Sequence, residues 1–141
     1  MKRERLDVQV ELGRRRMGDG PEHDVVLVSC RSLGAEMARL VGCAILLPTG
    51  LRLLSEGVLA SYPFDLAPGD TCVDGFDCHH VARQLAQVGE AGTVSITAAF
   101  FQAFPRPQPL GMEVPWAQWE PAPFGYQQRS RPLGFDVRRW L

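Results

Sequence analysis

The sequence contains no long apolar run. Charged or polar residues interrupt every stretch of its 141 residues before the ~18 uninterrupted apolar residues that a membrane-spanning helix needs. The opening segment MKRERLDVQVEL starts with positive charge, but no apolar stretch of signal-peptide length follows it. We therefore expect a cytoplasmic protein with no membrane partner, whose four cysteines are reduced.

Neither sign of charge is in clear excess. Fifteen Lys and Arg residues stand against sixteen Asp and Glu residues, which gives a net charge of −1. The basic residues near the amino terminus form two small groups, residues 2–5 and residues 14–16, and acidic residues are interleaved with them. Because nucleic-acid binding needs a concentrated basic surface, we do not expect a nucleic-acid partner.

Complete catalytic motifs are also missing. The sequence has no Gly-rich phosphate loop, no Ser-centred nucleophile elbow and no HExxH metal motif. Its clustered aspartates, residues 65, 70, 74 and 77, fall where turns are expected, and aspartate is favoured there for local hydrogen bonding. These absences favour a protein without catalytic activity, and we expect no cofactor.

The pattern of apolar residues predicts a small α+β domain over residues 1–104. Strict alternation in LDVQVEL is typical of a half-buried strand, and Pro48-Thr49-Gly50 joins two apolar runs as a hairpin would. Helices are expected over residues 32–41, capped by Ser32, and over residues 78–88. The sheet should be mostly antiparallel with about five or six strands. The expected strands are residues 6–12, 25–28, 44–47, 51–54, 58–62 and 93–101.

Composition changes sharply after Phe104. Residues 105–141 hold seven of the eleven prolines and all three tryptophans, a mixture that predicts an extended chain with aromatic anchors. We expect this arm to pack on its own domain or on a neighbouring subunit. Its carboxyl-terminal end, where Phe135 and Val137 alternate, could add a strand to an open sheet edge. The candidate interaction residues are Trp116, Trp119, Phe124, Tyr126, Phe135, Arg138, Arg139 and Trp140.

The segment DTCVDGFDCHH, residues 70–80, is rich in residue types that bind metals. Cys72, Cys78, His79 and His80 are thiol and imidazole ligands of the kind that zinc prefers. The segment also fits the start of a capped core helix, in which Asp77 is the N-cap and an apolar stripe consists of Cys78, Val81, Leu85 and Val88. We favour the capped helix and keep two alternatives, the four-residue metal site and a Cys72–Cys78 disulfide.

Cys30 is the candidate for thiol chemistry. It ends a predicted strand and comes directly before a predicted helix, whose amino terminus would stabilise a thiolate. The segment DVVLVSCRSLGAEMARLVGCAIL resembles the strand, Cys-Arg-Ser loop and helix of rhodanese-type sulfurtransferases, and more faintly that of low-molecular-weight tyrosine phosphatases. This resemblance implies that Cys30 is a nucleophile and that Arg31 and Ser32 lie in an anion-binding loop.

Three functions therefore remain open from the sequence. The leading hypothesis is a non-enzymatic protein-interaction or assembly module, which forms a homo-oligomer or binds another protein through its aromatic arm. The second is a small thiol-dependent enzyme that uses Cys30. The third is a small-molecule binding domain with its pocket between the sheet and the helices.

Overall fold

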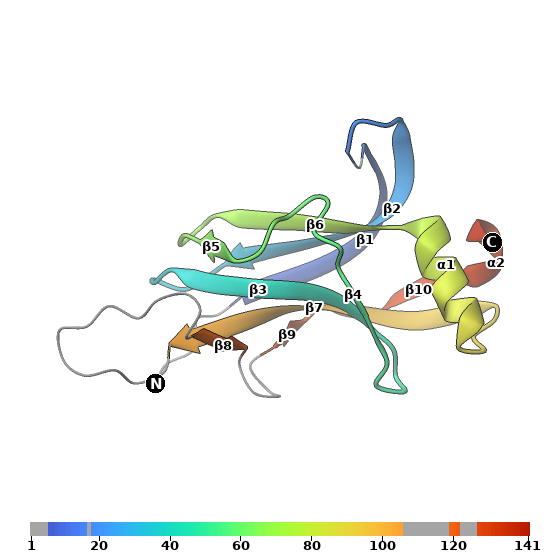
Figure 1. Cartoon of the computed structure of the whole chain (residues 1–141). Coiled ribbons are helices and arrows are strands. Elements are labelled where there is room, and N and C mark those ends of the chain that lie inside the picture. The colour runs from blue at the N-terminus through green and yellow to red at the C-terminus, as the bar shows by residue number, and fades with distance from the viewer. Residues whose placement is uncertain (1–5, 17, 106–118, 122–126) are drawn as a thin grey trace.

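The computed structural model describes residues 6–16, 18–105, 119–121 and 127–141 (Figure 1). Ten strands and two helices follow one another along these residues. The strands are β1 (Leu6–Arg16), β2 (Glu22–Ser32), β3 (Ala38–Leu46), β4 (Arg52–Leu54), β5 (Phe64–Leu66), β6 (Thr71–Asp77), β7 (Thr93–Pro105), β8 (Trp119–Pro121), β9 (Gln128–Arg129) and β10 (Leu133–Asp136); the helices are α1 (Cys78–Gln87) and α2 (Val137–Trp140).

The strands form two antiparallel sheets. The first has the order β1–β2–β6, and the second has the order β10–β7–β3–β4, with β5 pairing with β3 and with β8 and β9 pairing with β7. The predicted class, a mostly antiparallel sheet with two short helices, is confirmed, but the expected strand number was too low. The core lies between the two sheets, as Figure 1 shows, and α1 and α2 cover one end of it.

Two predicted elements are wrong. Residues 33–37 form a bend instead of a helix, and β3 begins at Ala38. Leu33 and Met37, which helical spacing would place on a buried face, are 51% and 59% exposed. Strand pairing of β3 with β5, β4 and β7 satisfies its backbone along both edges, and this tertiary pairing outweighs the local helical pattern. The strand expected at residues 58–62 is also absent, because this segment is irregular.

Residues 55–63, which we call the strap, connect β4 to β5 of the larger sheet and pass beside β6 of the smaller sheet (Figure 1). Successive side chains of β6 point to opposite faces of its sheet, and the strap touches both faces. On one face the Tyr62 hydroxyl donates to Asp74 Oδ2 at 2.6 Å. On the other, Leu59 lies so close to Gly75 that an added Cβ atom would be 2.7 Å from Leu59 Cδ1. The strap therefore holds β6 from both sides.

The described part of the carboxyl-terminal arm lies along β7. Strands β8, β9 and β10 all pair antiparallel with the edge of β7 that β3 leaves open. Between β9 and β10, Ser130 N donates to the carbonyl of Ala98 at 2.8 Å, and Ala98 N donates to Ser130 Oγ at 2.9 Å. Phe135 is fully buried in the core. This end of the arm adds a strand to a sheet edge, and the edge belongs to its own chain.

Candidate functional site

Helix α1 forms one wall of the candidate site. Asp77 has extended backbone angles, and its Oδ1 accepts a hydrogen bond from His79 N at 3.3 Å, so it is the N-cap predicted from the sequence. Cys78, Val81 and Leu85 are buried as the stripe predicts. The last member, Val88, is the C-cap residue that follows α1 and is half exposed. Its apolar side chain lies at the edge of a groove.

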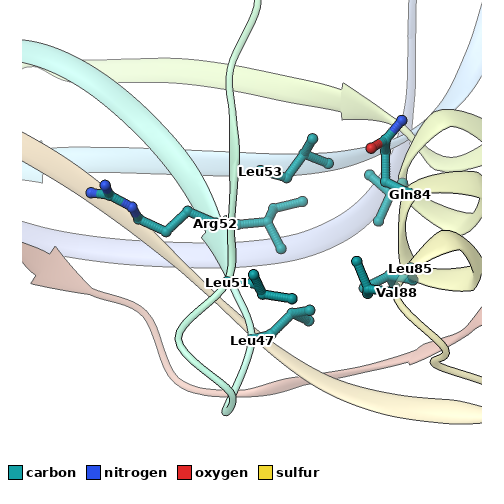
Figure 2. A pocket seen from close by; sticks show the side chains of 9 residues that line it. Leu47, Leu51, Arg52, Leu53, Gln84, Leu85 and Val88 are labelled. Carbon is teal, nitrogen blue, oxygen red and sulfur yellow. The ribbon is translucent and has the colours of Figure 1, made fainter.

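The β3–β4 hairpin forms the other wall. Residues Ala44–Leu46 pair with Arg52–Leu54 as predicted, and Leu47 N donates to the carbonyl of Leu51 at 3.0 Å. Figure 2 shows Leu47, Leu51 and Leu53 of this hairpin facing α1. The space between the two walls, which we call the groove, is open to solvent on one side and has a volume of about 110 Å³. It is lined by Ile45, Leu47, Leu51, Arg52, Leu53, Val81, Gln84, Leu85 and Val88.

The chemistry of the groove is almost entirely aliphatic. Nine of the described residues line it; seven of them are Ile, Leu or Val, and none is Cys, His, Asp, Glu or Ser. The Arg52 guanidinium lies over the Phe101 ring, 5.8 Å from its centroid, and Figure 2 shows it directed away from α1. Empty cavities of about 150 Å³ with similar lining stay dry and take up one apolar ring. The groove can therefore hold one aromatic or branched aliphatic group.

One edge of β4 is unpaired beside the groove. Hydrogen bonds from Leu47 N to the carbonyl of Leu51 and from Ser55 N to that of Cys43 mark the residues whose backbone faces β3. Backbone groups alternate in direction along an antiparallel strand, so the N–H and C=O groups of Arg52 and Leu54 point away from β3. Within the described part of the chain, β4 is the last strand of its sheet and nothing pairs with this edge.

A second, more polar depression lies beyond Leu54. It has a volume of about 230 Å³ and is lined by Leu54, Glu56, Val58, Gly75, Phe76, Asp77, His80 and Arg83. His80 Nε2 lies 3.8 Å from Glu56 Oε1 across it, and the Glu56 side chain is 72% exposed. An exposed pair at this distance contributes little to stability.

The structure does not bring the four candidate metal ligands together. Cys72 lies in β6 directly opposite Cys30 of β2, whereas Cys78 is buried at the start of α1. His79 Nδ1 lies 2.6 Å from the carbonyl oxygen of Trp140 in α2, and its ring meets the Trp140 ring edge-on at 5.9 Å. Across the residues that the structure describes, no group of three His, Cys, Asp or Glu side chains could hold a metal ion.

Cys30 lies within a strand and not at a helix start. The helix that was to follow it is absent, so no helix amino terminus stabilises its thiolate. It is fully buried, and burial, with the neighbouring Cys72, raises the pKa of its thiol from 9.0 to about 12. Burial raises the pKa of Cys72 to about 11, and burial with nearby Asp74 raises that of Cys43 as well. All three thiols are therefore protonated at neutral pH.

A buried polar pair next to these thiols was not predicted. Asp74 is fully buried; its Oδ2 accepts the Tyr62 hydroxyl, and its Oδ1 accepts Gly75 N at 2.8 Å. The sequence carried a signal for it, since alternation in TCVDGFD places Asp74 on the same face as Cys72 and Phe76. Burial, followed by the neighbouring Cys43 and the hydrogen bond to Asp74, raises the pKa of the Tyr62 hydroxyl.

The candidate interaction residues of the arm have different positions. Phe135 and Trp140 are buried in their own chain, and their rings stack with centroids 6.5 Å apart. The Arg139 guanidinium lies over the Trp140 ring at 4.4 Å, while the Arg138 side chain is 76% exposed and lies 3.6 Å from Asp136. Trp119 lies in β8, where its backbone pairs with Pro105 of β7. The predicted anchors Trp116, Phe124 and Tyr126 lie outside the described residues.

Comparisons with known proteins add no assignment. No protein-family model matches the chain, and no curated protein or solved structure is significantly similar to it. None of the helices in the described ranges combines the length and the apolar character that crossing a membrane requires.

Proposed function

We propose that this protein is a non-enzymatic protein-interaction module that binds an extended segment of a partner beside β4. The observation that carries the proposal is the unpaired edge of β4 next to an aliphatic groove. An unpaired strand edge binds another strand through backbone hydrogen bonds, and a neighbouring pocket selects one of its side chains. The groove would take an apolar side chain from such a segment.

The composition of the groove supports binding over catalysis. Arg52 and Gln84 are the polar residues of the lining that the structure describes, and neither is a nucleophile or a general base at neutral pH. The thiol hypothesis lacks comparable support, because Cys30 is fully buried and its pKa is raised to about 12. A protein with four free cysteines suits a reducing compartment, so we propose the cytoplasm as its location.

The groove, and not the aromatic arm, is the surface that we assign to the partner. Phe135 and Trp140 fill the core of their own chain and are unavailable to a partner without unfolding. Leu51 and Val88, in contrast, line the groove and are each about half exposed. Contiguous exposed apolar side chains are typical of binding surfaces.

A small apolar ligand is the second candidate, because the groove could hold one ring. The small ligand and the partner peptide differ in which groups of β4 they would contact. A small molecule needs only the aliphatic lining, whereas a peptide also needs the N–H and C=O groups of Arg52 and Leu54. Selection from a displayed library of random peptides therefore tests the proposal directly.

We expect selection to enrich extended peptides that have an apolar residue at one fixed position. Val88→Glu should abolish their binding by placing a carboxylate at the groove. Leu33→Glu is the matched control, since Leu33 is 51% exposed and Val88 50%, and Leu33 lies outside the groove lining. Failure to enrich any peptide whose binding Val88→Glu abolishes, at protein concentrations up to about 100 µM, would contradict the proposed function.

A further inference from the structure

We propose that the segment bound at β4 is β4 of a second copy of this chain, paired antiparallel across a two-fold axis through Leu53. This inference rests on the proposed function and names its partner. The resulting dimer would join the two β10–β7–β3–β4 sheets into one continuous sheet. The backbone and the side chains of the three β4 residues are both complementary to those of β4 in a second copy.

The backbone of β4 is complementary to a second copy of itself. Arg52 and Leu54 direct their N–H and C=O groups away from β3, whereas Leu53 directs its own toward β3. A two-fold axis through Leu53 places Arg52 opposite the partner's Leu54, and Leu54 opposite the partner's Arg52. Each of these facing pairs exchanges two N–H···O=C bonds. All the outward backbone groups of β4 are then satisfied.

The side chains in this register are also compatible. Arg52 faces the partner's Leu54 and not the partner's Arg52, so no like charges stand directly opposite each other. Leu53 meets the partner's Leu53 at the closely spaced, non-hydrogen-bonded position, where Cα atoms lie about 4.5 Å apart. Since Leu53 lines the groove, the two grooves meet at the axis. The half-exposed Leu51 and Leu54 border the same edge.

The symmetry of the pairing favours a closed pair over an open chain of molecules. In the larger sheet of the described residues, β4 and β10 are the two terminal strands, and the proposed pairing uses β4 of both copies. A two-fold interface uses the same surface on both copies and therefore ends assembly at the dimer. A three-residue strand makes a small interface, so we expect a dissociation constant in the micromolar range.

Disulfide trapping tests the register. In the proposed dimer, Leu53→Cys places two thiols at the two-fold axis, within reach of a disulfide. The four native cysteines are buried, so they should not compete. We expect mild copper–phenanthroline oxidation to convert most of the L53C protein to a covalent dimer at about 50 µM. The matched control is Leu51→Cys, which lies two residues, or about 7 Å, from the axis and should crosslink at least tenfold more slowly.

Loss of one outward donor tests the backbone pairing. Leu54→Pro removes an N–H that faces away from β3, and proline is tolerated at such positions of edge strands. Light scattering coupled to gel filtration, from about 10 µM to 1 mM, should show a dimer for the wild type. L54P should dimerise about tenfold to hundredfold more weakly, because the two-fold axis removes two hydrogen bonds. Leu54→Val keeps the N–H and should dimerise normally; circular dichroism checks that each variant is folded.

The outcomes separate this inference from the proposed function. A wild-type monomer at 1 mM would overturn the dimer, as would an L54P dimer of unchanged affinity or equal crosslinking of L53C and L51C. Peptide selection that Val88→Glu abolishes would then still support a binding module for a different partner. A dimer with the expected crosslink but no selected peptide would support self-association and remove the broader binding role.

Discussion

At the residue scale, burial governs the chemistry of the cysteines. Cys30 and Cys78 are fully buried, and burial raises both pKa values to about 12. Since the thiolate is the reactive species, we expect no reaction of the native protein with 5,5′-dithiobis(2-nitrobenzoate) at pH 8. Four thiols should react after denaturation in urea. Rapid alkylation of Cys30 at pH 6 would contradict this expectation and restore the thiol-enzyme hypothesis.

The same burial should lower the free energy of unfolding at alkaline pH. Unfolded cysteine titrates near 9.0, whereas folded Cys30 titrates at about 12. The unfolded state therefore loses this proton first as the pH rises, so the stability is fully present below pH 9 and falls between pH 9 and 12. Each such thiol should contribute a loss of about 1.4 kcal/mol per pH unit in that window. Urea unfolding from pH 8 to 10 measures the slope, and Cys30→Ala should make it shallower.

The hydrogen bond between Tyr62 and Asp74 should also be measurable. Tyr62→Phe leaves one oxygen of a fully buried carboxyl group without its hydroxyl donor. We expect a loss of about 1–3 kcal/mol in the free energy of unfolding, measured by urea denaturation. Ser55→Ala, which removes a hydrogen bond to Gly57 N within the same strap, serves as the control. An equal effect of both substitutions would mean that burial of Asp74 adds nothing.

At the scale of elements, the capping residue of α1 can be tested by itself. Asp77→Ala removes the oxygen that accepts His79 N. The expected cost is about 1 kcal/mol of unfolding free energy, since N-cap aspartates contribute about 0.5–2 kcal/mol. Asp77→Asn keeps an acceptor at the same place and should retain most of the stability. Urea unfolding with circular dichroism detection compares the three proteins, and an unchanged alanine variant would contradict the capping role.

Elements whose signals agree locally were predictable from the sequence. LDVQVEL alternates and forms β1, Pro48-Thr49-Gly50 joins the β3–β4 hairpin, and Asp77 caps α1. Residues 32–41 were misassigned because Leu33, Met37 and Leu40 have helical spacing. In the structure these residues are buried with the two-residue period of a strand, so that Ala38 and Leu40 both face the core. The strand signal at residues 58–62 was also misleading, because Leu59 and Tyr62 pack on opposite faces of β6.

At the scale of the whole molecule, the arm completes the fold. A chain that ends at Phe104 would lose β8, β9, β10 and α2, uncover one edge of β7, and remove Phe135 and Trp140 from the core. We expect it to lose cooperative thermal unfolding, because removal of each large core side chain alone costs about 3–5 kcal/mol. Deletion of Leu141 alone, which is 67% exposed, is the control and should preserve the transition. A folded, cooperative chain ending at Phe104 would contradict this role.

The groove could be predicted from the sequence only in part. The stripe that ends at Val88 and the leucines around Pro48 were visible in the sequence. A pocket between the sheet and the helices was only one of three open alternatives, and no lining residues were predicted for it. The two walls of the groove come from segments about thirty to forty residues apart, and only their packing into one common core brings them together. Local periodicity reports which side chains are apolar, but not which of them remain uncovered.

The long-range pairing of β2 with β6 has a kinetic consequence. The β1–β2 and β3–β4 hairpins join neighbouring segments, whereas Cys30 of β2 meets Cys72 of β6 and Val94 of β7 meets Phe135 of β10. Closing such long loops before their contacts form slows folding into the range of milliseconds to seconds. During that interval β2 exposes an unpaired edge rich in Val and Leu. Refolding should therefore succeed best in dilute solution, where these edges close within one chain before they meet another.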